Sequence, residues 1–151
     1  MRISDSFEQI SNYSHFRNWA PDWEVVKEVY DNFPESHSVL TPFAYAYLEE
    51  LIRSTTSEYG RELLDKNGKP KKRRNGIGLI KLAIRENKPN SEEFIRLLEG
   101  IKSYFLPSQS TDEGDNRHSV AHGYMHPKFW TKESFENLIY SIAKLSKYSG
   151  T

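Results

Sequence analysis

The stretch TKESFENLIYSIAKL, residues 131–145, carries the pattern that decides the fold of this chain. Thr131 and the three polar residues after it open a helix, and apolar residues then follow at the spacing of one helical face, namely Phe135, Leu138, Ile139, Ile142 and Leu145. Similar spacing recurs along the chain, and no run alternates between apolar and polar residues for long enough to predict a strand. We therefore expect an all-α fold, a compact antiparallel bundle of about five to seven helices.

Turn-forming and capping residues divide the rest of the chain into six further helices. The expected ranges are 5–16, 23–32, 41–59, 77–86, 90–106 and one from about 110 to 123. Asp22 is expected to cap the second helix, and Thr41-Pro42 to provide the cap and the first residue of the third. Residues 110–113, Ser-Thr-Asp-Glu, form a capping box for the sixth helix, which should end near residues 123–127.

Length and composition set the class of protein. The 151 residues suit one domain, which we expect to span residues 1–151. The chain has no Cys, which excludes a disulfide scaffold, thiolate metal ligands and a thiol nucleophile. No apolar run is long enough to cross a membrane, and no signal peptide is visible, so we expect a cytoplasmic protein with no membrane partner.

Charge is balanced overall, with 21 basic and 21 acidic residues, but it is unevenly distributed. Residues 1–60 carry four bases and ten acids, residues 61–106 carry twelve bases and six acids, and residues 107–151 carry five of each. Such asymmetry bears on partners rather than on fold, and it permits an anionic ligand near the middle segment.

The stretch Arg117-His118-Ser119-Val120-Ala121-His122 holds the residues best suited to chemistry. Histidine titrates near neutral pH, and arginine is a permanent cation whose planar fork suits phosphate. Such a pair can cleave a phosphodiester, because His122 can move a proton while Arg117 stabilises charge developing on the phosphate oxygens. Residues five apart lie about 140° apart around a helix, so the long Arg117 side chain has to reach toward the groove that His122 faces.

This stretch resembles the Arg-x4-His motif of the HEPN superfamily, in which a polar residue directly follows the arginine. HEPN domains are compact helical bundles with this motif on a late helix and one more helix after it, and the order of expected helices here agrees. The resemblance implies metal-independent RNA cleavage without a cofactor, with Arg117 and His122 in the catalytic positions and His118 in the polar position. The implied reaction is attack of the ribose 2′-OH on the adjacent phosphorus, which leaves a 2′,3′-cyclic phosphate.

The same resemblance implies partners and a role. Many HEPN proteins are toxins or antiphage-defence effectors of prokaryotes, so RNA and an antitoxin or nucleotidyltransferase are the implied partners. A homodimer that pairs the motif helices would bring two arginines and two histidines to one groove. Other HEPN domains are non-catalytic, so a module binding RNA, a nucleotide or a protein is the alternative. A third hypothesis is an unrelated helical adaptor in which the spacing of Arg117 and His122 is accidental.

A basic stretch within residues 65–76 is the second candidate site. It combines the turn signals Asn67-Gly68 and Asn75-Gly76 with six cations in nine residues, Lys66, Lys69, Lys71, Lys72, Arg73 and Arg74. An RNA backbone is one partner for such a stretch. The residues expected to contact it are Lys69, Lys71, Lys72, Arg73 and Arg74. A solvated loop, or a loop neutralised by the acidic first third of the chain, is the alternative.

The remaining histidines have simpler interpretations. His118, His122 and His126 are four residues apart, a spacing that can bind zinc or nickel on a helix. The helix is expected to end before His126, so we expect no metal site and assign His126 to the C-terminal end of the helix dipole. His15 and His37 lie among polar residues and are expected at the surface.

Overall fold

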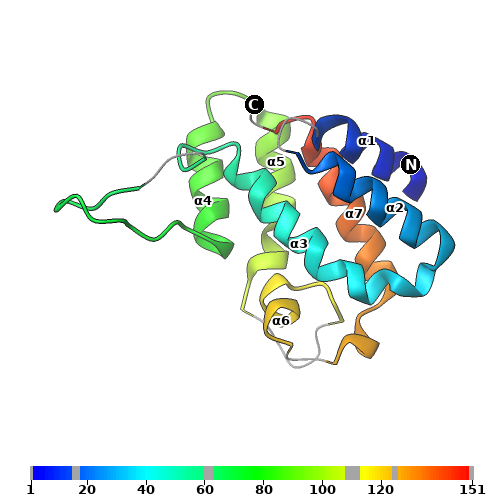
Figure 1. Ribbon diagram of the computed structural model, residues 1–151. Helices are drawn as coiled ribbons and strands as arrows, with labels where there is room; N and C mark the ends of the chain where they lie inside the picture. The colour runs from blue at the N-terminus through cyan, green and yellow to red at the C-terminus, as the bar shows by residue number, and fades with distance from the viewer. Residues whose placement is uncertain (1, 15–17, 60–62, 108–112, 124–125, 150–151) are drawn as a thin grey trace.

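The computed structural model describes residues 2–14, 18–59, 63–107, 113–123 and 126–149. Across these ranges it contains seven α-helices, three short 3-10 helices and an isolated β-bridge, which confirms the predicted all-α bundle (Figure 1). The α-helices are α1 (Ile3–Ser14), α2 (Ala20–Asn32), α3 (His37–Arg53), α4 (Gly76–Asn87), α5 (Glu92–Ile101), α6 (Arg117–His122) and α7 (Lys132–Ser146). The 3-10 helices are η2 (Pro34–Ser36), η3 (Lys102–Phe105) and η4 (Pro127–Phe129).

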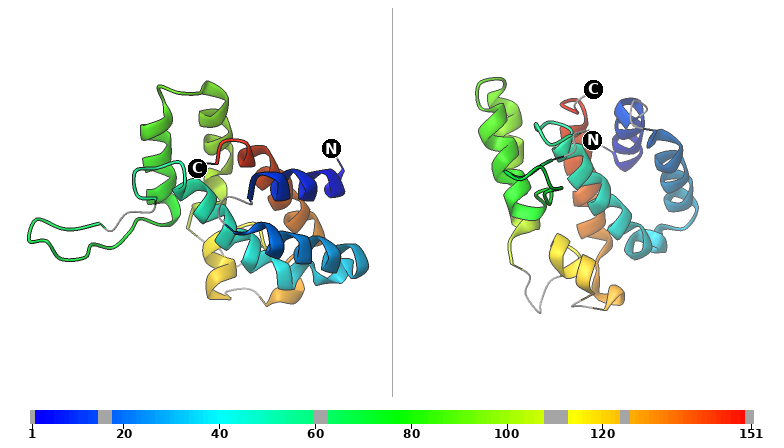
Figure 2. Two further views of the ribbon diagram at one scale, coloured as in Figure 1. Left: turned by 45° about the horizontal axis from the view of Figure 1, so that its top comes forward. Right: turned by 60° about the vertical axis from the view of Figure 1, so that its left-hand side comes forward.

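Helix α7 lies at the centre of the bundle, where it packs against α1, α3 and α5 (Figure 2). Its predicted apolar face is buried throughout, from Phe135 to Leu145, with no member more than 2% exposed. Aromatic side chains of α2 and α3 also contribute to the core, where Trp23 packs edge-on against Tyr47 with ring centroids 5.0 Å apart. Among the described residues, no helix combines the length and the apolar character needed to cross a membrane.

The start of α2 differs from the prediction. The helix begins at Ala20, and Asp22 lies in its first turn instead of capping it. Trp19 occupies the N-cap position without a side-chain cap, and Pro21 stands among the first two helical residues. Proline is tolerated there because the first N–H groups of a helix have no intrahelical partner.

The prediction that α3 starts at Thr41-Pro42 is wrong, because the helix begins at His37 and holds Pro42 in its interior. Thr41 is not a cap, since its hydroxyl donates back to the His37 carbonyl at 2.7 Å. The additional turn is fixed from outside the helix. The His37 ring lies 2.9 Å from the Trp130 carbonyl oxygen and 3.2 Å from that of Pro34, so His37 is half-buried instead of lying at the surface.

Helix α3 also ends earlier than predicted, at Arg53 instead of residue 59. Three consecutive hydroxyl residues follow it, and each donates its hydroxyl to a carbonyl of the last helical turn. Ser54 bonds Leu51, Thr55 bonds Ile52 and Thr56 bonds Arg53, at 2.5, 2.7 and 2.8 Å. Such local bonds compete with helical continuation, which explains the early end.

Residues 63–75 form a hairpin arm, which we call the cationic hairpin, and it extends away from the bundle in Figures 1 and 2. Its two sides are joined by hydrogen bonds from Lys71 N to Leu63 O at 2.7 Å and from Asp65 N to Lys69 O at 2.8 Å. Gly68 at the tip has φ +78°, which glycine adopts without steric cost. The basic stretch of the sequence therefore forms a hairpin.

Candidate functional site

The candidate motif lies on α6, which packs against α3 and η3 at one end of the bundle (Figure 1). Asn116 caps this six-residue helix by accepting a hydrogen bond from Ser119 N at 2.9 Å, and its amide donates to the Leu106 carbonyl at 2.8 Å. Gly123 ends the helix with φ +63°, as predicted. The helix is shorter than expected, since it begins at Arg117 and Glu113 lies outside it.

The capping box proposed for this helix falls largely on Ser110, Thr111 and Asp112, which lie outside the described residues. The approach to α6 is fixed instead by a close backbone contact. Gly114 has φ +90°, and a Cβ added there would lie 2.9 Å from the Cβ of Trp130. The Tyr45 hydroxyl donates to the Gly114 carbonyl at 3.1 Å. Glycine is therefore required here for both its conformation and its lack of a side chain.

The two motif histidines lie side by side on α6. The ring centroids of His118 and His122 are 4.3 Å apart, with the ring planes tilted by 53°. His118 is partly buried and His122 is exposed, so the pair runs from the edge of the bundle to solvent. Two imidazoles at this separation can serve the same substrate, one accepting a proton and the other donating one.

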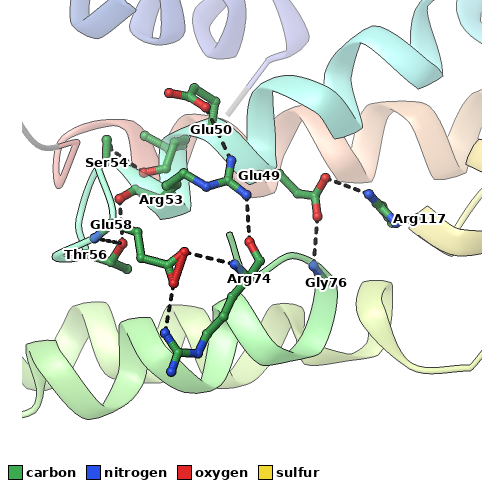
Figure 3. A network of polar contacts seen from close by, with 10 residues as sticks. Glu49, Glu50, Arg53, Ser54, Thr56, Glu58, Arg74, Gly76 and Arg117 are labelled. Carbon is green, nitrogen blue, oxygen red and sulfur yellow. Dashed lines mark hydrogen bonds and ion pairs between the residues drawn. The ribbon is translucent and has the colours of Figure 1, made fainter. Parts of the chain in front are cut away.

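Arg117 is held by a carboxylate that sequence reasoning missed. Its Nη2 donates to Glu49 Oε2 at 2.9 Å, and both side chains are largely buried, at 24% and 13% exposed (Figure 3). The other oxygen of Glu49 accepts a hydrogen bond from Gly76 N at 2.8 Å. Glu49 thus joins α3, α6 and the first residue of α4. The sequence did contain one indication of this role: Glu49 follows the buried Tyr45 by one helical turn, so both residues lie on the same face of α3.

Arg117 and His118 share a cleft of about 300 Å³. Its other walls are residues 75–77, at the start of α4, and residues 105–107, which begin at the last residue of η3. Among the described residues His122 does not line this cleft, and it joins the site through its contact with His118. The structure therefore places Arg117 beside His118 and His118 beside His122, in agreement with the wide angle between positions 117 and 122 on a helix.

Five guanidinium N–H groups are available on any arginine, so the bond to Glu49 leaves donors for a phosphate. The Glu49 carboxylate also fixes the direction of the Arg117 side chain, which reduces the conformational entropy that a bound anion would have to remove. The ion pair with Glu49 therefore positions the Arg117 guanidinium before an anionic ligand binds.

All five predicted RNA-binding residues are on the cationic hairpin and exposed, and four of them are Lys69, Lys71, Lys72 and Arg73. Arg74 differs because its guanidinium donates to Glu58 Oε2 at 2.9 Å and its backbone N–H donates to Glu58 Oε1 at 2.9 Å (Figure 3). Arg53 donates to the Arg74 carbonyl at 2.8 Å. Arg74 thus anchors the root of the hairpin to α3 and the turn after it, and its guanidinium is engaged with a protein carboxylate.

Glu58 is the buried end of this anchor, with its side chain 2% exposed. Burial by itself raises the pKa of a carboxyl group. Here the hydrogen bonds from the backbone and the guanidinium of Arg74, with the charges of Arg74 and Arg53, outweigh burial and hold the pKa of Glu58 below its ordinary value. Glu58 therefore carries a negative charge at neutral pH.

The interpretation of His126 needs correction. Its Nδ1 accepts a hydrogen bond from Lys128 N at 3.1 Å, so His126 caps η4 and does not lie at the end of the α6 dipole. Within the described ranges, no group of three or more His, Cys, Asp or Glu side chains could hold a metal ion.

No family model, no curated protein and no solved structure matches this chain. The resemblance to HEPN domains therefore rests on the motif and on its place in the order of helices.

Proposed function

We propose that this protein is a metal-independent endoribonuclease of HEPN type, with Arg117, His118 and His122 as its catalytic residues. One observation carries the proposal: Glu49 holds Arg117 at 2.9 Å in a cleft that His118 also lines, while the His118 ring lies 4.3 Å from that of His122. A fixed guanidinium next to two imidazoles supplies the charge and the proton carriers that phosphodiester transfer requires.

In the proposed reaction the ribose 2′ oxygen attacks the adjacent phosphorus and the bond from phosphorus to the 5′ oxygen breaks. His122 accepts the proton of the 2′-OH, and a second imidazole donates a proton to the departing 5′ oxygen. Arg117 stabilises the negative charge that develops on the non-bridging oxygens. The products are a 2′,3′-cyclic phosphate and a 5′-OH, so RNA is the substrate because DNA lacks the 2′-OH.

Either of two residues can supply the second imidazole in this proposal, His118 of the same chain or His122 of a second chain. His118 supplies it within one chain, where it already lies against His122. A homodimer that pairs the α6 helices across a two-fold axis supplies a second His122, and we propose this dimer as the active form. Light scattering coupled to size exclusion tests the dimer directly. A strictly monomeric protein that cleaves RNA would overturn the dimer and leave His118 as the second proton carrier.

The biological role follows as part of the proposal. An RNA-cleaving domain of this kind acts in the cytoplasm as a toxin or antiphage effector, restrained by an antitoxin or nucleotidyltransferase partner. Expression of the unaltered chain in a bacterial host should then arrest growth, and His122→Ala should relieve the arrest. Growth arrest that persists in His122→Ala would contradict the toxin role of the site.

The test of the proposal is cleavage of a mixed RNA substrate by purified protein in EDTA. The unaltered protein should cleave, and His122→Ala and Arg117→Ala should each lose about 10²-fold or more in rate while keeping the far-UV circular dichroism of the folded chain. His126→Ala is the matched control, because His126 lies beyond α6, and it should retain activity. Equal loss in all three variants, or cleavage that survives His122→Ala, would contradict the assignment.

The alternative is a non-catalytic HEPN-like module that binds RNA, a nucleotide or a protein. The observation favouring it is that His122 does not line the cleft among the described residues. This alternative predicts that the protein binds RNA and leaves it intact under every condition in which the dimer is folded.

A further inference from the structure

The cationic hairpin is shaped by its own sequence. The Asp65 carboxylate accepts hydrogen bonds from Asn67 N at 2.8 Å and from Lys69 N at 3.0 Å, and Gly68 N donates to the Asp65 carbonyl at 3.1 Å. A turn of this kind followed by a glycine at positive φ is a common three-residue hairpin loop. Asp65 is the single acid between residues 63 and 75, and its carboxylate is used to form the turn.

Most cations of the hairpin lie on its second side, residues 69–75, which is exposed. Every residue from 64 to 75 is exposed, and Leu64 pairs with Pro70 across the hairpin. Side chains alternate along a strand, so Lys69 and Lys71 share one face about 6.6 Å apart, which is twice the rise per residue. That spacing resembles the separation of successive phosphates in an extended nucleic-acid strand. Lys72 adds a third exposed cation next to them.

The root of the hairpin is also a wall of the proposed active site. Glu58 and Arg53 hold Arg74, and Glu49 holds Gly76 through the same carboxylate that binds Arg117 (Figure 3). Residues 75–77 line the cleft together with Arg117 and His118. An RNA strand that leaves this cleft along that wall would therefore run toward residues 69–75 of the hairpin.

We propose that the cationic hairpin binds the phosphate backbone of the RNA segment that flanks the cleaved bond, and that Lys69, Lys71 and Lys72 are its main contacts. This inference rests on the proposed function, because it places the scissile phosphate beside Arg117. It deepens that function by assigning a second binding surface, so that RNAs long enough to reach from the cleft onto the hairpin are bound more tightly than short ones.

The experiment compares two triple variants with equal loss of charge. One replaces Lys69, Lys71 and Lys72 with Gln, and the matched control replaces Lys81, Lys132 and Lys144, which are exposed on α4 and α7. Both carry His122→Ala, so that bound RNA stays intact. Fluorescence anisotropy with fluorescein-labelled oligoribonucleotides of increasing length gives the affinity at several salt concentrations.

The hairpin variant should lose the gain in affinity with RNA length and bind at least about 10-fold more weakly at low salt. The slope of log K against log[salt] should fall by about 2, because each phosphate contact on a single strand contributes about 0.7. The control variant should keep both the length dependence and the slope. Equal behaviour of the two variants would overturn the inference, as would binding of phosphatidylserine vesicles by the hairpin without binding of RNA.

The result is independent of whether the chain cleaves RNA. If the unaltered protein cleaves RNA but RNA affinity does not depend on the hairpin charges, the inference is overturned and the nuclease proposal remains. Binding that depends on the hairpin, in a protein that never cleaves RNA, supports the binding surface and overturns the nuclease proposal.

Discussion

Replacing Glu49 with Gln tests whether a carboxylate holds Arg117, the arginine of the proposed site. Gln keeps one oxygen that can accept the hydrogen bond from Gly76 N, which in the unaltered protein is 2.8 Å from Glu49 Oε1. The substitution removes the negative charge that binds Arg117 Nη2 at 2.9 Å. A hydrogen bond to a charged group contributes about 1.5–3 kcal/mol. Because the Arg117 side chain is 24% exposed, water replaces part of that bond, and we expect a loss of about 1–2 kcal/mol. For a chain of this size the melting temperature should fall by about 2–8 °C.

Urea unfolding and RNA cleavage measure the two consequences separately. The unfolding midpoint of Glu49→Gln should drop without a change in slope, and the cleavage rate should fall by up to about 10²-fold, because the guanidinium loses its fixed position. Glu50→Gln is the matched control. Glu50 pairs with Arg53 in the same helix at 3.4 Å, and its loss should cost no more than about 0.5 kcal/mol. Indistinguishable effects of the two substitutions would refute the role given to Glu49.

Four further changes test the surroundings of the site. Asn116→Ala should lower the free energy of unfolding by about 1–2 kcal/mol in urea, because Asn116 caps α6; an unchanged midpoint would contradict the cap. Gly123→Ala should cost about 1–2 kcal/mol for its positive φ alone. Gly114→Ala should cost about 2–5 kcal/mol, because its Cβ would also lie 2.9 Å from that of Trp130, and equal losses would argue against that contact. The pKa of Glu58 is lower in the folded state, so its contribution to stability is complete above pH 4.5 and is lost as the pH falls through the folded value. Denaturation from pH 7 to pH 3 should show this loss, and Glu58→Gln should lack it.

The sequence was sufficient for the elements in which local pattern and packing agree. The apolar stripe of α7 is regular over about three turns, and the core buries it as predicted. At α3 the local signal was misleading, since Thr41-Pro42 suits a helix start. The carbonyl of Trp130, 93 residues away from His37, stabilises an earlier start, and no local propensity contains that contact.

In the candidate site, too, the sequence was sufficient for some residues and not for others. Arg117, His118 and His122 could be proposed from the sequence because they lie within six residues and their side chains have recognisable chemistry. Glu49 was missed because it lies 68 residues from Arg117, and Glu58 was missed because only its burial distinguishes it from other acids. The charge of the basic stretch was evident in the sequence, but its hairpin shape and its root in the cleft wall depend on contacts with α3 and the turn after it.

The central claim concerns the 2′ oxygen of the RNA. It is tested most directly by incubating one oligoribonucleotide, and a copy carrying a 2′-O-methyl group at the cleaved position, with the protein in EDTA, followed by mass spectrometry of the ends. The account predicts a 2′,3′-cyclic phosphate and a 5′-OH from the first oligonucleotide and no cleavage at the methylated position of the second. Cleavage at the methylated position, or a linear phosphate as the first product, would contradict it.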